Sequence, residues 1–124
     1  MKKILITGLF LTLSGCSSIM GIVGMEPFDG NEYGYANSVR TQAQTMSCTK
    51  AETESLNNTA IAFKNYTQYI PYNDKTIDMA TDLQKLTDEL AKRDNPSSVY
   101  CKLKLNMISK SAEEIQRVVG SKPR

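Results

Sequence analysis

Apolar residues recur every three or four positions in four successive segments between residues 32 and 120, which is the period of an amphipathic helix. The core-facing positions are Tyr33, Ala36, Val39, Ala43 and Met46, then Leu56, Ala60, Phe63, Thr67 and Ile70, then Ile77, Ala80, Leu83, Leu86 and Leu90, and last Cys101, Leu105, Ile108, Ala112, Ile115 and Val119. Leu103 and Met107 lie beside the last stripe and could widen it. The pattern predicts four helices.

Capping and helix-breaking residues separate these segments. The first ends near Ser47, and Thr49 with Glu52 forms a capping box that starts the second. The other boundaries are the turn 71–74 with the N-cap candidates Asn73 and Asp74, the break at 94–97, and Gly120 followed by Pro123. Because short connections favour antiparallel neighbours, we predict an all-α fold, a small up-and-down helical hairpin or four-helix bundle.

The first sixteen residues are typical of a bacterial secretory signal. Residues 1–3 carry positive charge, residues 4–13 are apolar, and Leu13-Ser14-Gly15-Cys16 places small residues directly before a cysteine. Ten apolar residues reach about 15 Å as a helix, whereas a bilayer core of roughly 30 Å needs about twenty. The segment Leu13–Cys16 resembles the lipobox of bacterial lipoproteins rather than an ordinary signal peptide with a chance cysteine. The resemblance implies cleavage before Cys16 and its acylation.

Lipoprotein processing would divide the chain into three parts. These are a signal peptide (1–15), a lipidated N-terminus and tether (16–30), and a helical periplasmic domain (31–124). Two or three acyl chains on Cys16 would hold the protein stably to a membrane. Ser17 stands where the enterobacterial signal for inner-membrane retention has Asp, which favours an outer-membrane, lipid-anchored location facing the periplasm. The apolar run at 19–25 is interpreted either as resting on lipid or on the domain, or as docking a partner.

Cys48 and Cys101 are the two cysteines left once Cys16 is acylated. An even pair in a small secreted domain is typical of a disulfide, because that compartment is oxidising. In an up-and-down bundle both positions lie at one end, and the bridge would contribute about 4 kcal/mol in the loop-entropy model. The alternatives are a redox pair or two metal ligands, but the sequence has no C-x-x-C and no histidine.

Composition argues against several classes of function. The chain has 15 Lys plus Arg against 13 Asp plus Glu, and loss of Lys2 and Lys3 with the signal peptide leaves it neutral. A neutral domain has no electrostatic reason to bind nucleic acid. There is no histidine, no phosphate loop and no nucleophile motif, so we expect no metal, no cofactor, no small-molecule substrate and no enzyme activity. The pairs Asp88-Glu89 and Glu113-Glu114 are interpreted as solvated acids rather than a glycosidase site.

Aromatic residues are the features that indicate a protein partner. The tyrosines are Tyr33, Tyr35, Tyr66, Tyr69, Tyr72 and Tyr100. They either cover the core with their hydroxyls in water or dock a partner. Phe28-Asp29, Glu32-Tyr33, Arg40 and residues 100–105 are further candidates for specific contacts.

A lipobox leader before a small disulfide-linked helical domain resembles the lipoproteins that tailed phages encode, and among these the outer-membrane spanin subunits. The resemblance implies binding to a coiled-coil inner-membrane spanin and disruption of the host outer membrane at lysis. Two alternatives remain open. One is a superinfection or entry exclusion lipoprotein, and the other is a structural accessory of an envelope or secretion complex.

Overall fold

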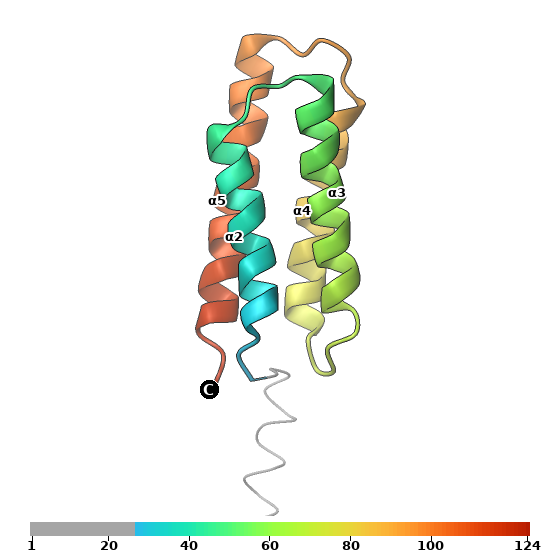
Figure 1. The fold of residues 1–124 in the computed structure, drawn as a ribbon. Helices are drawn as coiled ribbons and strands as arrows, with labels where there is room; N and C mark the ends of the chain where they lie inside the picture. The colour runs from blue at the N-terminus through green and yellow to red at the C-terminus, as the bar shows by residue number, and fades with distance from the viewer. Residues whose placement is uncertain (1–26) are drawn as a thin grey trace, which may run out of the picture.

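A computed structural model describes residues 27–124, which form four α-helices (Figure 1). They are α2 (Gly30–Thr45), α3 (Lys50–Thr67), α4 (Asp74–Lys92) and α5 (Ser98–Gly120). No strand occurs within residues 27–124, so the all-α prediction is confirmed for this part of the chain. The expected signal peptide, the expected lipidation site Cys16 and residues 17–26 of the expected tether lie outside the described residues.

The four helices form an up-and-down bundle, as predicted. α2 packs against α3 and α5, and α4 packs against the same two helices, so each helix has two neighbours. Figure 1 shows the α2–α3 and α4–α5 connections at one end, which we call the disulfide end (residues 46–49 and 93–97). The opposite end, which we call the terminal end, holds residues 27–29, the α3–α4 connection (68–73) and residues 121–124.

The predicted apolar stripes fill the interior of the bundle. The predicted positions that are buried are Ala36, Val39, Ala43, Leu56, Ala60, Phe63, Thr67, Ala80, Leu83, Leu90, Leu105, Ile108, Ala112, Ile115 and Val119. In α4 the buried face is displaced by one position in places, because Thr76 and Thr87 are buried where Ile77 and Leu86 were expected. The Thr87 hydroxyl donates to the side-chain oxygen of Asn57 at 2.8 Å. A satisfied hydroxyl can occupy a core position that the apolar pattern does not reveal.

The capping box that starts α3 is confirmed in one half only. Thr49 is the N-cap residue, and its hydroxyl accepts the backbone N–H of Glu52 at 3.3 Å. The Glu52 carboxylate accepts the backbone N–H of Ser47 at 3.1 Å and the Thr49 hydroxyl at 2.9 Å. Glu52 therefore secures the chain two residues before the N-cap residue, which stabilises the α2–α3 connection as well as the helix.

α2 begins earlier than its apolar period indicates. One Asp29 oxygen accepts the backbone N–H groups of Asn31 and Glu32 at 2.8 and 2.9 Å, so the helix starts directly after Asp29. The backbone N–H of Phe28 donates to the carbonyl oxygen of Pro123 at 2.8 Å. Phe28 and Asp29 therefore belong to the folded bundle, whereas the sequence pattern places them in the tether.

A disulfide joins Cys48 to Cys101, as predicted, with a Cα–Cα distance of 6.0 Å. Cys48 lies in the α2–α3 connection and Cys101 in the first turn of α5. The bridge therefore joins the α2–α3 connection to the start of α5, two parts of the chain that are far apart in sequence, at the disulfide end.

Candidate functional site

The outer face of α5 carries a row of exposed apolar side chains. Val99, Leu103 and Met107 are 78%, 56% and 41% exposed. They are four residues apart, so they follow one another along one side of the helix. The expectation that Leu103 and Met107 widen the core stripe is wrong, because α5 directs them to solvent. We call Val99, Leu103 and Met107 the α5 stripe.

Basic residues border the α5 stripe. Lys102 and Lys110 are exposed, and neither forms an ion pair with any of residues 27–124. Lys104, on the side facing α4, pairs with Glu89. An apolar row with a basic border suits an amphipathic helix whose polar positions carry acidic residues.

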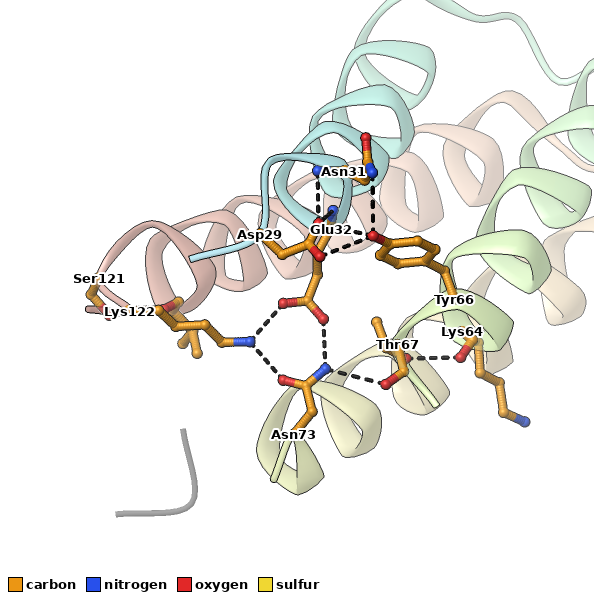
Figure 2. Close-up of polar contacts among 10 residues, drawn as sticks. Asp29, Asn31, Glu32, Lys64, Tyr66, Thr67, Asn73, Ser121 and Lys122 are labelled. Atoms are coloured by element: carbon orange, nitrogen blue, oxygen red, sulfur yellow. Dashed lines mark hydrogen bonds and ion pairs between the residues drawn. The ribbon is translucent and has the colours of Figure 1, made fainter. Parts of the chain in front are cut away.

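A buried cluster of three polar side chains closes the terminal end (Figure 2). The Lys122 ammonium lies 2.6 Å from Glu32 Oε1 and donates to Asn73 Oδ1 at 2.6 Å. The Asn73 amide nitrogen donates to Glu32 Oε2 at 2.6 Å. These residues come from the first turn of α2, the α3–α4 connection and the segment after α5. The cluster, which we call the terminal clasp, therefore joins three parts of the chain that are distant in sequence.

Asn73 also explains how α4 begins. It occupies the predicted N-cap position, but its side chain makes no capping hydrogen bond. Its amide nitrogen donates to the Thr67 carbonyl oxygen at 3.3 Å as well as to Glu32, and its amide oxygen accepts from Lys122. Both ends of the amide are therefore committed to the terminal clasp, and α4 begins without the side-chain cap that the sequence predicts.

A second polar layer lies beside the terminal clasp. The Tyr66 hydroxyl donates to the Asp29 carboxylate, with oxygen distances of 2.9 and 3.1 Å, and accepts from the Asn31 amide at 3.3 Å (Figure 2). The bond from Asn31 lowers the pKa of Tyr66, but burial and the negative charge of Asp29 raise it, and the net pKa lies above the ordinary 10.0. The phenol therefore keeps its proton and connects α3 to the N-cap of α2.

The terminal clasp offers no access to a substrate. The side chains of Glu32 and Lys122 are 0% and 2% exposed, and their charged atoms are bonded to one another and to Asn73. Within residues 27–124, no group of three or more His, Cys, Asp or Glu side chains could hold a metal ion. The clasp therefore holds helix ends together. Sequence reasoning missed it, because charged residues near helix ends are ordinarily solvated.

Three of the candidate contact residues lie together. Phe28, Tyr33 and Arg40 line one groove of about 670 Å³ between α2 and α5. The Phe28 and Tyr33 rings lie 5.9 Å apart, and the Arg124 guanidinium lies 4.1 Å from the Phe28 ring. Residues 100–105 begin α5 at the disulfide end and are not part of this groove.

Three of the four paired acids form ion pairs, and Glu89 does so with Lys104 of α5. Asp88 lies 2.8 Å from Lys92, and Glu114 lies 2.7 Å from Arg117. Each of these carboxylates faces a basic residue of its own helix, which agrees with the interpretation of solvated acids.

The six tyrosines divide between the two interpretations. Tyr35 and Tyr100 are half-buried against the core, and Tyr66 belongs to the polar layer. Tyr33 was expected to face the core, but it is 38% exposed and lines the groove with Phe28, so that expectation is wrong. Tyr69 and Tyr72, in the α3–α4 connection, are 88% and 63% exposed. Tyr72 has φ 55°, a left-handed conformation that costs a residue with a side chain about 1–2 kcal/mol. Exposure and backbone cost make these two rings candidates for contact with something outside the domain.

No protein family, no curated protein and no solved structure matches this chain. None of the helices between residues 27 and 124 is long and apolar enough to span a membrane. The N-terminal lipobox pattern and the surfaces of the bundle are therefore the features that bear on function.

Proposed function

We propose that this protein is an outer-membrane lipoprotein, anchored by acyl chains on Cys16, that acts by binding a protein partner. The α5 stripe carries this proposal. Three large apolar side chains follow one another on one helix face, where they lower solubility and do not stabilise the core. An exposed apolar row of this kind is typical of a surface that binds a partner. The charged groups of the terminal clasp are bonded to one another, and Asp88, Glu89 and Glu114 are paired with basic residues. These pairings support binding rather than catalysis.

The arrangement of the bundle suits display of the α5 stripe away from the anchor. The chain enters the bundle at the terminal end (Figure 1). Val99 is the second residue of α5, which begins at the disulfide end. The 23 residues of α5 span about 35 Å. The twelve Cα–Cα steps from Cys16 to Phe28 span at most about 43 Å. A partner rooted in the inner membrane would meet the disulfide end first.

The first candidate role is that of an outer-membrane spanin subunit, whose partner is a coiled-coil inner-membrane spanin. Side chains spaced at i, i+4 and i+8 match the way one helix docks along another, and the border of Lys102 and Lys110 favours acidic residues on that partner. Binding would draw the two membranes together, because one partner is held by acyl chains and the other by its own membrane segment.

The second candidate role is an exclusion lipoprotein that blocks an outer-membrane receptor or incoming secretion machinery. The observation that favours it is the double closure of the bundle, by the disulfide at one end and the terminal clasp at the other. A fold held at both ends presents a preformed surface, and preformed surfaces bind with little ordering cost.

Leu103→Glu tests the binding surface, because it places a charge in the middle of the α5 stripe without touching the core. Ile61→Glu is the matched control, since Ile61 is an exposed apolar residue of α3, 38% exposed. Both variants should keep the disulfide and the melting temperature of the parent. We expect Leu103→Glu to abolish function and Ile61→Glu to leave it intact, and equal effects of the two would contradict the α5 stripe as the binding site.

The assay follows lysis in cells that carry the variant gene, under divalent-cation stabilisation of the outer membrane. For a spanin subunit, Cys16→Ser and Leu103→Glu should both leave spherical cells that persist after the wall is degraded. Normal lysis combined with lost resistance to a second phage or plasmid would instead assign the exclusion role. Labelled palmitate in Cys16→Ser protein would contradict the anchor.

A further inference from the structure

The α3–α4 connection presents an uncharged aromatic surface. Residues 68–73 contain no charged side chain. Tyr69 is 88% exposed and Tyr72 is 63% exposed, and Pro71 between them is exposed as well. Tyr72 keeps its side chain at a left-handed φ of 55°, where glycine carries no steric penalty. The exposed aromatic ring at this strained position is therefore a candidate for contact outside the fold.

This surface lies at the end of the bundle where the chain enters from Cys16. Figure 1 shows the α3–α4 connection at the same end of the bundle as the start of α2 and the last residues after α5. The Phe28–Pro123 hydrogen bond fixes the entry point at this end, and the terminal clasp ties Asn73 of the connection to Glu32 of α2. The position of the two tyrosines relative to the entry point is therefore set by buried contacts.

Tyrosine suits the boundary between lipid and water, because its ring is apolar and its hydroxyl bonds to headgroups and water. Because residues 68–73 carry no charge, contact with zwitterionic lipid avoids the large cost of desolvating a charged side chain. The eleven residues between Cys16 and Phe28 (17–27) also keep the domain at a high effective concentration near the bilayer, so a weak surface contact is populated. The opposite end, with Lys102 near the exposed Val99, has no comparable uncharged aromatic loop.

We infer that the terminal end of the bundle rests on the bilayer that holds Cys16, with Tyr69 and Tyr72 at the level of the lipid headgroups. The inference rests on the proposed acylation of Cys16 and adds an orientation to it. The bundle stands on its terminal end, and the start of the α5 stripe points away from the membrane.

The chain contains no tryptophan, so a single introduced tryptophan reports one position. Tyr69→Trp places the probe in the α3–α4 connection, and Val99→Trp places a matched control, 78% exposed, at the disulfide end. The acylated full-length proteins are reconstituted into phosphatidylcholine–phosphatidylethanolamine vesicles with and without brominated acyl chains. Flotation of the vesicles measures anchoring, and tryptophan emission measures the orientation.

We expect both proteins to float with the vesicles. The emission of Tyr69→Trp should shift to shorter wavelength and be quenched by brominated lipid, and that of Val99→Trp should remain at its solvent-exposed wavelength and unquenched. Floating protein with neither probe quenched, or with both quenched equally, would overturn the orientation and leave the anchor standing. Protein that does not float would overturn the anchor and the orientation together.

A double variant separates lipid contact from protein contact at the same loop. Lys75→Trp alone should be quenched by brominated lipid. When Tyr69→Ser and Tyr72→Ser are added to it, the tryptophan should lose this quenching, and partner binding should be unchanged. Lys75 lies in the first turn of α4 and is exposed. Loss of partner binding with unchanged quenching would overturn the inference and assign the loop to a protein.

Discussion

Replacing Lys122 by methionine removes the cation of the terminal clasp and keeps most of the side-chain volume. The Glu32 carboxylate, 0% exposed, then retains only the amide of Asn73 as a partner. Breaking a buried ion pair by removing one member costs about 3–5 kcal/mol, because the remaining charge is left without compensation. A domain of this size has a stability of about 5–15 kcal/mol, so the loss is a large fraction of the total.

Urea unfolding followed by circular dichroism measures the effect on protein expressed from residue 17 onward, which carries neither the apolar leader nor an acyl chain. We expect the midpoint to fall at unchanged slope, and the melting temperature to fall by about 12 °C or more. Arg117→Met is the matched control, because its pair with Glu114 is exposed and should contribute less than about 0.5 kcal/mol.

A second variant distinguishes charge burial from lost packing. Glu32→Leu combined with Lys122→Met removes both charges, and it should recover part of the stability that Lys122→Met loses, since apolar pairs often replace buried ion pairs without cost. The Asn73 amide stays unpaired, so recovery should be incomplete. If Lys122→Met destabilises no more than Arg117→Met, the pair is solvated and the reasoning is refuted.

The remaining predictions concern the disulfide, the core and the polar layer. Replacing Cys48 and Cys101 by serine should cost about 4 kcal/mol, because the bridge spans 53 positions, and unfolding of reduced and oxidised protein measures it. Ile108→Ala should cost about 2–5 kcal/mol at a position with 0% exposure, and an unchanged melting temperature would contradict its place in the core. The pKa of Tyr66 should lie above 10.0. Absorbance at 295 nm measures tyrosine ionisation, and the difference between the titrations of the parent and of Tyr66→Phe isolates Tyr66. Because its pKa is higher in the folded state, its contribution to stability is complete below pH 10 and declines as pH rises through the folded value.

Local patterns determined the helices of this protein. The apolar period predicts four helices, and their ends are marked by Pro71, by residues 94–97 and by Gly120. The sequence suffices here because these signals act within one or two helical turns of their own position. Cys48 and Cys101 could be paired from the sequence, because short connections leave an up-and-down order that brings both to one end.

The surfaces proposed for function were less predictable. The sequence indicated the tyrosines as candidates for contact, but it did not indicate that Tyr69 and Tyr72 are the most exposed. It also predicted that Leu103 and Met107 lie at the edge of the core. A side chain's exposure depends on how its helix is rotated against its neighbours. In α5 the core face is centred on residues such as Ile108 and Ile115, and this places the α5 stripe on the opposite side.

Only the tertiary structure decided the partners of Glu32, Asn73 and Lys122. These residues are 41 and 49 positions apart along the chain, and none carries a local signal of burial. Asn73 reads as a helix cap and Lys122 as a solvated cation after the end of a helix. The bundle brings the first turn of α2, the α3–α4 connection and the end of α5 together, and three polar groups excluded from water there must satisfy one another. The helical period of the sequence predicts which face of each helix is apolar, but it does not predict which helix ends contact one another.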